Sequence, residues 1–117
     1  MNMVYVPTEM TWKDAHSFCQ RHGAQLATAP TERMNEWLCK EILRLTLGQP
    51  IWLGATDVKK EGTWAWVDGA PWLYNNWLNN QPDNKHRSEH ALLLQPDGFW
   101  FDENGSKAIA GFVMVWP

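Results

Sequence analysis

The sequence has only two cysteines, Cys19 and Cys39, so it can form at most one internal disulfide. A domain of this size that lacks a disulfide framework needs a hydrophobic core of its own. The cysteine content therefore says little about the cellular compartment. Whether the two cysteines pair is left open, because they lie on different predicted helices.

Long apolar runs and blocks of like charge are also absent. No stretch approaches the roughly 20 apolar residues that cross a bilayer, and residues 1–10 lack a signal-peptide pattern. The net charge is −3 and the ten lysines and arginines are scattered, so no basic stripe follows a phosphate backbone. We expect no nucleic acid partner and no membrane insertion. We also expect that the chain is either made without export or cut from a larger protein.

Tryptophan is abundant, with nine residues among 117. Each tryptophan buries about 150 to 250 Å², so this number suits a rigid core more often than a surface contact. The length fits one domain with a single core, spanning residues 1–117.

Two helices are predicted in the first half of the chain. Thr11 is a candidate N-cap, and the apolar residues 12, 15, 18 and 19 then share one face until Gly23. A second helix begins near Pro30 and Thr31, and Gly48 and Pro50 end it; its predicted inward residues are Met34, Trp37, Leu38, Ile42 and Leu45.

From Ile51 onward, short extended runs separated by turn residues predict a sheet. Residues 69–89 form a long loop without periodicity, and such loops in compact domains are usually functional or disordered. Trp72, Tyr74 and Trp77 favour order, because they can anchor the loop to the body. Two helices followed by a sheet make an α+β fold.

The tripeptide Gln-Pro-Asp occurs at 81–83 and again at 95–97. The second copy is followed by Gly98 and stands between two apolar runs. Asp-Gly between strands is a strong hairpin signal, so we predict a turn there and not a site.

The motifs "TWKDAHSFCQRHGAQLATAP", "IWLGATD", "TWAWVDG", "NNWLNNQPDN" and "GFWFDENG" occur in the order and spacing of the C-type lectin-like domain, which the chain resembles over nearly its whole length. The resemblance implies two helices, a small antiparallel sheet and a long loop region that holds calcium in sugar-binding members. Gln-Pro-Asp in that loop, usually with a cis proline, implies a galactose-type preference. The implied ligands of calcium and sugar are Gln81, Asp83, Glu89 and Asp102, and their oxygens suit that ion.

Three positions depart from the family pattern. Phe101 stands where the resemblance implies an asparagine ligand, so the calcium site is weakened or lost. The stretch after Asp83 lacks the family's aromatic platform, a role left to His86. The implied disulfide partners are Met114, Ala91 and Gly105, and the loss of both bridges suggests a bacterial or phage origin, or a protein kept reduced. An extracellular or cell-surface location is favoured, and a cytoplasmic one stays open.

Alternatives concern the histidines and the acids. Cys19 with His16 or His22 could form a nucleophile and its base, but no oxyanion loop or third orienting residue accompanies them. His86 and His90 could ligate a transition metal. Asp83, Glu89 and Asp102 could be solvated loop charges, or paired carboxylates for glycoside hydrolysis. We predict a binding protein and not an enzyme: a calcium-dependent galactose-type lectin or, alternatively, a calcium-independent adhesin or receptor-binding domain that contacts protein.

Overall fold

The computed structural model describes residues 2–46, 48–78, 81 and 89–116. Its elements are β1 (Met3–Met10), α1 (Trp12–Arg21), β2 (Gln25–Leu26), α2 (Glu32–Thr46), β3 (Ile51–Thr56), β4 (Ala65–Trp66), β5 (Ala91–Leu94), β6 (Trp100–Glu103) and β7 (Ala110–Val115). The α+β prediction is confirmed. Among the described residues, no helix is long and apolar enough to cross a membrane.

Each helix begins at a hydroxyl side chain, as predicted. The Thr11 hydroxyl accepts a hydrogen bond from the Asp14 N–H at 3.1 Å, and the Thr31 hydroxyl accepts one from the Met34 N–H at 3.2 Å. Gly23, just after α1, has a φ of 70°, a value that glycine adopts at little cost. These local signals explain why both helix starts were predictable.

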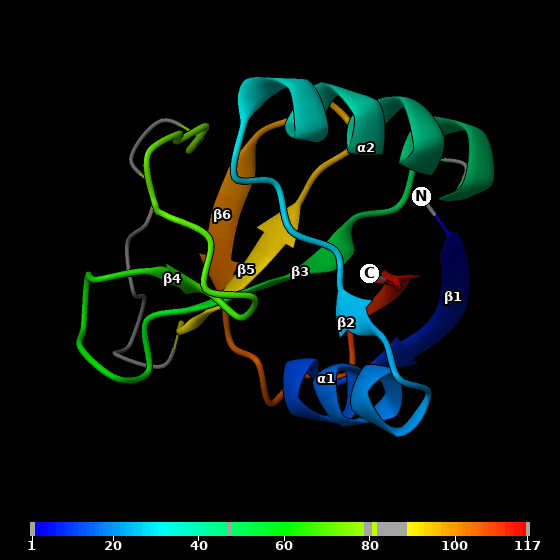
Figure 1. Ribbon diagram of the computed structural model, residues 1–117, viewed down its shortest axis with the longest axis horizontal. Coiled ribbons are helices and arrows are strands. Elements are labelled where there is room, and N and C mark those ends of the chain that lie inside the picture. The colour runs from blue at the N-terminus through cyan, green and yellow to red at the C-terminus, as the bar shows by residue number, and fades with distance from the viewer. Residues whose placement is uncertain (1, 47, 79–80, 82–88, 117) are drawn as a thin grey trace.

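The strands form one sheet in the order β1-β7-β3-β5-β6, with β2 beside β7 and β4 beside β3. All pairs are antiparallel except β3 with β7. Figure 1 shows α2 on one side of the sheet and α1 on the other, with the two chain ends close together. Strand β1 was not predicted from the sequence, although its pairing with β7 closes the domain.

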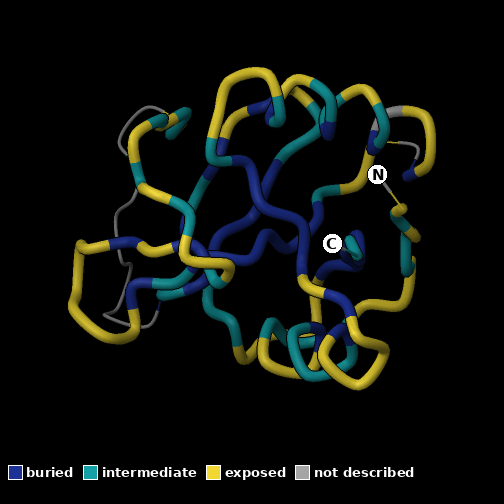
Figure 2. Tube along the Cα trace, viewed as in Figure 1, coloured by how far each residue is buried: buried dark blue, intermediate teal, exposed yellow. Residues whose placement is uncertain are grey.

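Two hydrophobic clusters fill the two faces of the sheet. The α2 cluster contains Leu38 and Ile42 together with the buried tryptophans 64, 66 and 100. The α1 cluster contains Ala15 and Cys19 together with Trp52 and Phe112. Buried chain runs through the centre of the molecule and exposed chain lies at its periphery (Figure 2).

The expectation that the tryptophans build the core is confirmed. Four are buried and the other five are partly buried, so none is fully displayed on the surface. The inward position predicted for Leu45 is wrong, because that side chain is 38% exposed. Thr46 is buried instead, and its hydroxyl donates to the Ile42 carbonyl. Cys19 and Cys39 are both free thiols.

Candidate functional site

The β5–β6 hairpin carries one of the predicted ligands. Leu92 pairs with Asp102, and Leu94 pairs with Trp100. Between the strands, the Gly98 N–H donates to the Gln95 carbonyl at 2.9 Å, and Gly98 has a φ of 98°. The second Gln-Pro-Asp is therefore a turn, as predicted.

The long loop is held against β6 by aromatic side chains, as predicted. The ring centroids of Trp72, Tyr74 and Trp77 lie 5.7, 5.6 and 5.8 Å from that of Trp100. Backbone hydrogen bonds follow the same line, since Leu78 N–H donates to the Trp100 carbonyl at 2.8 Å. The loop therefore approaches the sheet at the strand that carries Asp102.

This approach brings Gln81 to Asp102. The Asp102 backbone N–H donates to Gln81 Oε1 at 3.3 Å. The Gln81 N–H in turn donates to the Leu78 carbonyl at 2.9 Å, which fixes the loop just before the tripeptide. Two of the four predicted ligands, from segments 21 positions apart, are thus in direct contact.

Both described acids among the predicted ligands are buried. Glu89 precedes β5 and is 9% exposed, and Asp102 on β6 is 2% exposed. Buried carboxylates are costly unless polar partners or a cation surround them. Asp83 lies outside the described residues, as does His86.

Phe101 lies on the opposite face of β6 from Asp102. Successive side chains of a strand point to opposite faces, and burial along β6 alternates accordingly. Phe101 packs against the α1 cluster, whereas Trp100 belongs to the α2 cluster. The aromatic ring therefore contributes to the core and does not fill the space beside Gln81.

A group of acids and a histidine was not anticipated from the sequence. Asp57, Glu61 and His90 bring their ligand atoms within 4.8 Å of one another. From the sequence, His90 was a candidate transition-metal ligand together with His86, which lies outside the described residues, whereas Asp57 and Glu61 were not candidates. His90 joins them because Thr56 on β3 pairs with Ala91 on β5.

The thiol and histidines of α1 do not form a nucleophilic site. Cys19 is fully buried, and desolvation raises the pKa of its thiol to about 11, so the reactive thiolate is scarce at neutral pH. The His16 ring stacks on Trp12, with centroids 5.0 Å apart, and burial lowers its pKa. The His22 ring faces the Phe18 carbonyl at 2.8 Å.

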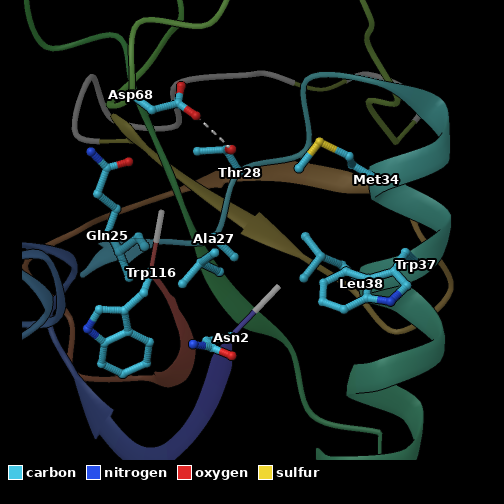
Figure 3. Close-up of a pocket in the computed structure, with 11 residues that line it drawn as sticks. Asn2, Gln25, Ala27, Thr28, Met34, Trp37, Leu38, Asp68 and Trp116 are labelled. Carbon is cyan, nitrogen blue, oxygen red and sulfur yellow. Dashed lines mark hydrogen bonds between the residues drawn. The ribbon is translucent and has the colours of Figure 1, made fainter. Parts of the chain in front are cut away.

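A cavity of about 740 Å³ lies apart from the predicted ligands, between α2 and the chain ends. Figure 3 shows Met34, Trp37 and Trp116 around it, with a hydrogen bond of 3.1 Å between the Thr28 hydroxyl and Asp68 at its upper edge. Gln81, Glu89 and Asp102 do not line it. It is therefore separate from the site predicted on the loop and β6.

Comparison with known proteins gives a consistent result. Residues 8–110 match the Lectin C-type domain family. A protein named Lectin from Pleurodeles waltl is 31% identical over 106 residues, which cover 86% of this chain and 61% of that protein. The galactose-specific lectin nattectin of Thalassophryne nattereri is 33% identical over 93 residues, covering 78% of this chain and 58% of its own length.

Among solved structures, the carbohydrate-recognition domain of the mouse scavenger receptor C-type lectin has a TM-score of 0.84 and 28% identity, with 96% of this chain and 84% of that chain covered. The chain thus spans about three fifths of the two relatives and most of this isolated domain. Both relatives come from animals, so they do not support the bacterial or phage origin suggested by the missing disulfides.

Proposed function

This chain belongs to the Lectin C-type domain family, and from that premise we propose that it binds carbohydrate through a calcium ion, with a preference for galactose-type sugars. The observation that carries the proposal is the contact between Gln81 Oε1 and the Asp102 N–H. It supports the proposal because it joins Gln81, the first residue of the tripeptide, to the strand that carries Asp102. Since the relatives are lectins, the prediction of a binding protein and not an enzyme stands.

The donor set fits calcium. Gln81, in contact with the Asp102 N–H, offers an amide oxygen, and Glu89 and Asp102 offer carboxylate oxygens. Calcium takes six to eight oxygen ligands, and carboxylates and amides are the side chains that supply them. Asp83 would add a fourth side chain, while Phe101 supplies no oxygen, so we expect weaker binding than in a site with a full ligand set.

The sugar would be held by the same side chains. A bound calcium ion supplies coordination positions for two neighbouring sugar hydroxyls. Gln81, Asp83 and Glu89 would exchange hydrogen bonds with those hydroxyls and thereby fix their orientation. The amide at 81 and the acid at 83 support a galactose-type preference, in line with the name of the relative nattectin.

A calcium-independent domain that contacts protein is the second candidate, and Phe101 favours it. Protein contact through the loop aromatics has little support, because Trp72, Tyr74 and Trp77 are partly buried against the core. The loop instead displays Leu73, which is 83% exposed. A single leucine is a small contact area, so the carbohydrate proposal ranks first.

The setting follows from the proposed ligand. We propose that residues 1–117 form a single domain that acts outside the cell or on its surface, where glycoconjugates are displayed. The names of the relatives, among them a salivary lectin and an asialoglycoprotein receptor, support this location. The parent protein, if longer, would add its own partners.

Calcium titration tests the proposal. Chelator-treated protein is titrated with calcium to millimolar concentration while heat and melting temperature are recorded, first alone and then with galactose or mannose. We expect calcium to raise the melting temperature and galactose to raise it further than mannose. A melting temperature that does not respond to calcium would refute the lectin proposal and favour the protein-binding candidate.

The two copies of the tripeptide supply a matched pair of variants. Asp83→Ala should abolish the calcium response, because it removes a proposed ligand. Asp97→Ala should preserve the response, because Asp97 belongs to the hairpin turn, where its Oδ1 accepts the Phe99 N–H at 3.1 Å. Equal calcium affinity in both variants would show that the metal lies elsewhere.

A further inference from the structure

The cavity of about 740 Å³ between α2 and the chain ends combines an apolar side with a polar one. Figure 3 shows Met34 and Trp37 of α2 on one side and Trp116 and Gln25 on the other, with Asn2 between the two sides. Small-molecule sites have roughly this volume, about 300 to 1,000 Å³, and they too combine aromatic walls with a few polar groups. The cavity therefore has the size and lining of a ligand site.

The two amides at the cavity limit the kind of ligand. Within the described part of the chain, the side chains of Asn2 and Gln25 have no hydrogen-bond partner. Each amide offers two N–H donors and a carbonyl acceptor. A purely apolar ligand would cover these groups without pairing them, which costs free energy. The ligand that fits must therefore carry groups that donate and accept hydrogen bonds.

The charge at the cavity favours a neutral ligand. Among the described residues that line it, Asp68 is the charged one. One carboxylate oxygen of Asp68 accepts the Thr28 hydroxyl at 3.1 Å, and the other accepts the Ala70 N–H at 3.0 Å. Because both oxygens already have partners, Asp68 is a weak site for an amine, while its negative charge repels an anion.

We propose that this cavity binds a neutral pyranoside without calcium. The apolar C–H face of the sugar ring packs against Trp37 and Trp116, whose rings supply a large apolar contact. The hydroxyls, which donate and accept as amides do, pair with Asn2 and Gln25. This inference goes beyond the proposed calcium site, because Gln81, Glu89 and Asp102 do not line the cavity.

The polar side of the cavity is fixed by the sheet. The Trp116 indole N–H donates to the His22 carbonyl at 2.8 Å, and its backbone N–H donates to the Asn2 carbonyl at 3.1 Å. Gln25 lies on β2, where it pairs with Val115 of β7. A site whose groups are already held in place loses less conformational freedom when the ligand binds.

Titration of chelator-treated protein with methyl glycosides of galactose, mannose and glucose tests the inference. The indole N–H signals of the protein are followed by NMR and assigned by replacing each tryptophan with phenylalanine in turn. We expect a glycoside to shift the signals of Trp37 and Trp116 and to leave that of the fully buried Trp52 in place. Cyclohexanol, a ring of the same size with a single hydroxyl, should shift them much less.

Two exposed glutamines supply matched variants. Gln25→Ala removes an amide from the cavity and should weaken glycoside binding about three- to tenfold, as expected for a lost hydrogen bond. Gln20→Ala removes a glutamine of α1 that does not line the cavity, and it should leave the affinity unchanged. Because both side chains are exposed, both variants should melt as the native protein does.

Four results would overturn the inference. The first is that none of the glycosides shifts the two signals, and the second is that cyclohexanol binds as tightly as the glycosides do. The third is equal glycoside affinity in Gln20→Ala and Gln25→Ala. The fourth is a shift that requires calcium, which would place all sugar binding at the calcium site. Failure of the calcium proposal would leave the chelator experiment unaffected, so the two proposals fail separately.

Discussion

At the scale of single residues, the neighbouring residues Phe101 and Asp102 have different roles. The Asp102 backbone N–H contacts Gln81, whereas the Phe101 ring packs against the α1 cluster. A side chain with an oxygen donor at position 101 would replace the ring in that cluster, and the apolar burial of the ring would be lost. The chain therefore gains core packing at the position where the family resemblance implies a ligand.

Phe101→Asn should lower stability and leave calcium affinity unchanged. The side chain at 101 lies on the face of β6 opposite Asp102, so an amide there points away from the proposed ligands. Loss of the partly buried ring should lower the free energy of unfolding by about 1 to 3 kcal/mol. Calorimetry gives the affinity, and urea unfolding with chelator gives the stability.

The control is Phe101→Leu, which removes the ring but adds no oxygen. It should lose less stability than Phe101→Asn, because leucine keeps apolar burial in the cluster. Tighter calcium binding by Phe101→Asn than by Phe101→Leu would show that position 101 reaches the metal.

At the scale of elements, one buried hydrogen-bond chain joins α2 to the β5–β6 hairpin. Trp100 Nε1 donates to Asn35 Oδ1 at 2.7 Å, and Asn35 Nδ2 donates to the Gly98 carbonyl at 3.0 Å. On the surface, Trp72 Nε1 donates to Asn75 Oδ1 at the same 2.7 Å. The two Trp–Asn pairs have equal length and differ in burial.

Asn35→Leu should destabilise the domain more than Asn75→Leu does. The first leaves the Trp100 N–H buried without its acceptor, which costs about 1 to 3 kcal/mol. The second leaves the Trp72 N–H open to water, and its cost should stay below about 0.5 kcal/mol. Urea unfolding followed by tryptophan fluorescence measures both. Equal losses would mean that burial of the pair does not decide its contribution.

Elements with a strong local signal were predictable from the sequence, and elements fixed by a distant partner were not. The caps Thr11 and Thr31 marked both helix starts. Strand β1 was missed because it contains Pro7 and its register with β7 shifts between Val6 and Met10. Leu45 was misplaced because the buried stripe of α2 continues four residues beyond Ile42, at Thr46.

The same limit applies to the two sets of candidate ligands. Gln81 and Asp102 could be named together from the family resemblance, and the structure brings them into contact. Asp57, Glu61 and His90 could not, because Asp57 and His90 are 33 positions apart and become neighbours only through the pairing of β3 with β5. Short local patterns do not encode that register.

At the scale of the whole molecule, one sheet replaces the cross-links that the family resemblance implies. The pairing of β1 with β7 joins the two ends of the chain, and the two clusters pack both faces of the sheet. A Cβ placed on Gly105 would lie 3.1 Å from the Cβ of Ala91. Positions 91 and 105 therefore lie at nearly the separation that a disulfide requires.

The double variant Ala91→Cys, Gly105→Cys should form a disulfide and stabilise the domain. Cβ atoms in disulfides are about 3.5 to 4.5 Å apart, so the backbone must yield by only a few tenths of an ångström. Closing a loop of about 15 residues restricts the unfolded chain by about 3 kcal/mol, less the strain from Trp12, whose Cβ would lie 3.2 Å from the new side chain.

The oxidised and reduced forms of this double variant provide the comparison, because they share every side chain and differ only in the bond. Thiol titration should find two free thiols in the oxidised form, those of Cys19 and Cys39, and thermal unfolding should give it the higher melting temperature. An oxidised form no more stable than the reduced one would mean that native strain cancels the loss of unfolded-state entropy. In that event the sheet and its two clusters would already impose the constraint that a bridge adds in other members of the family.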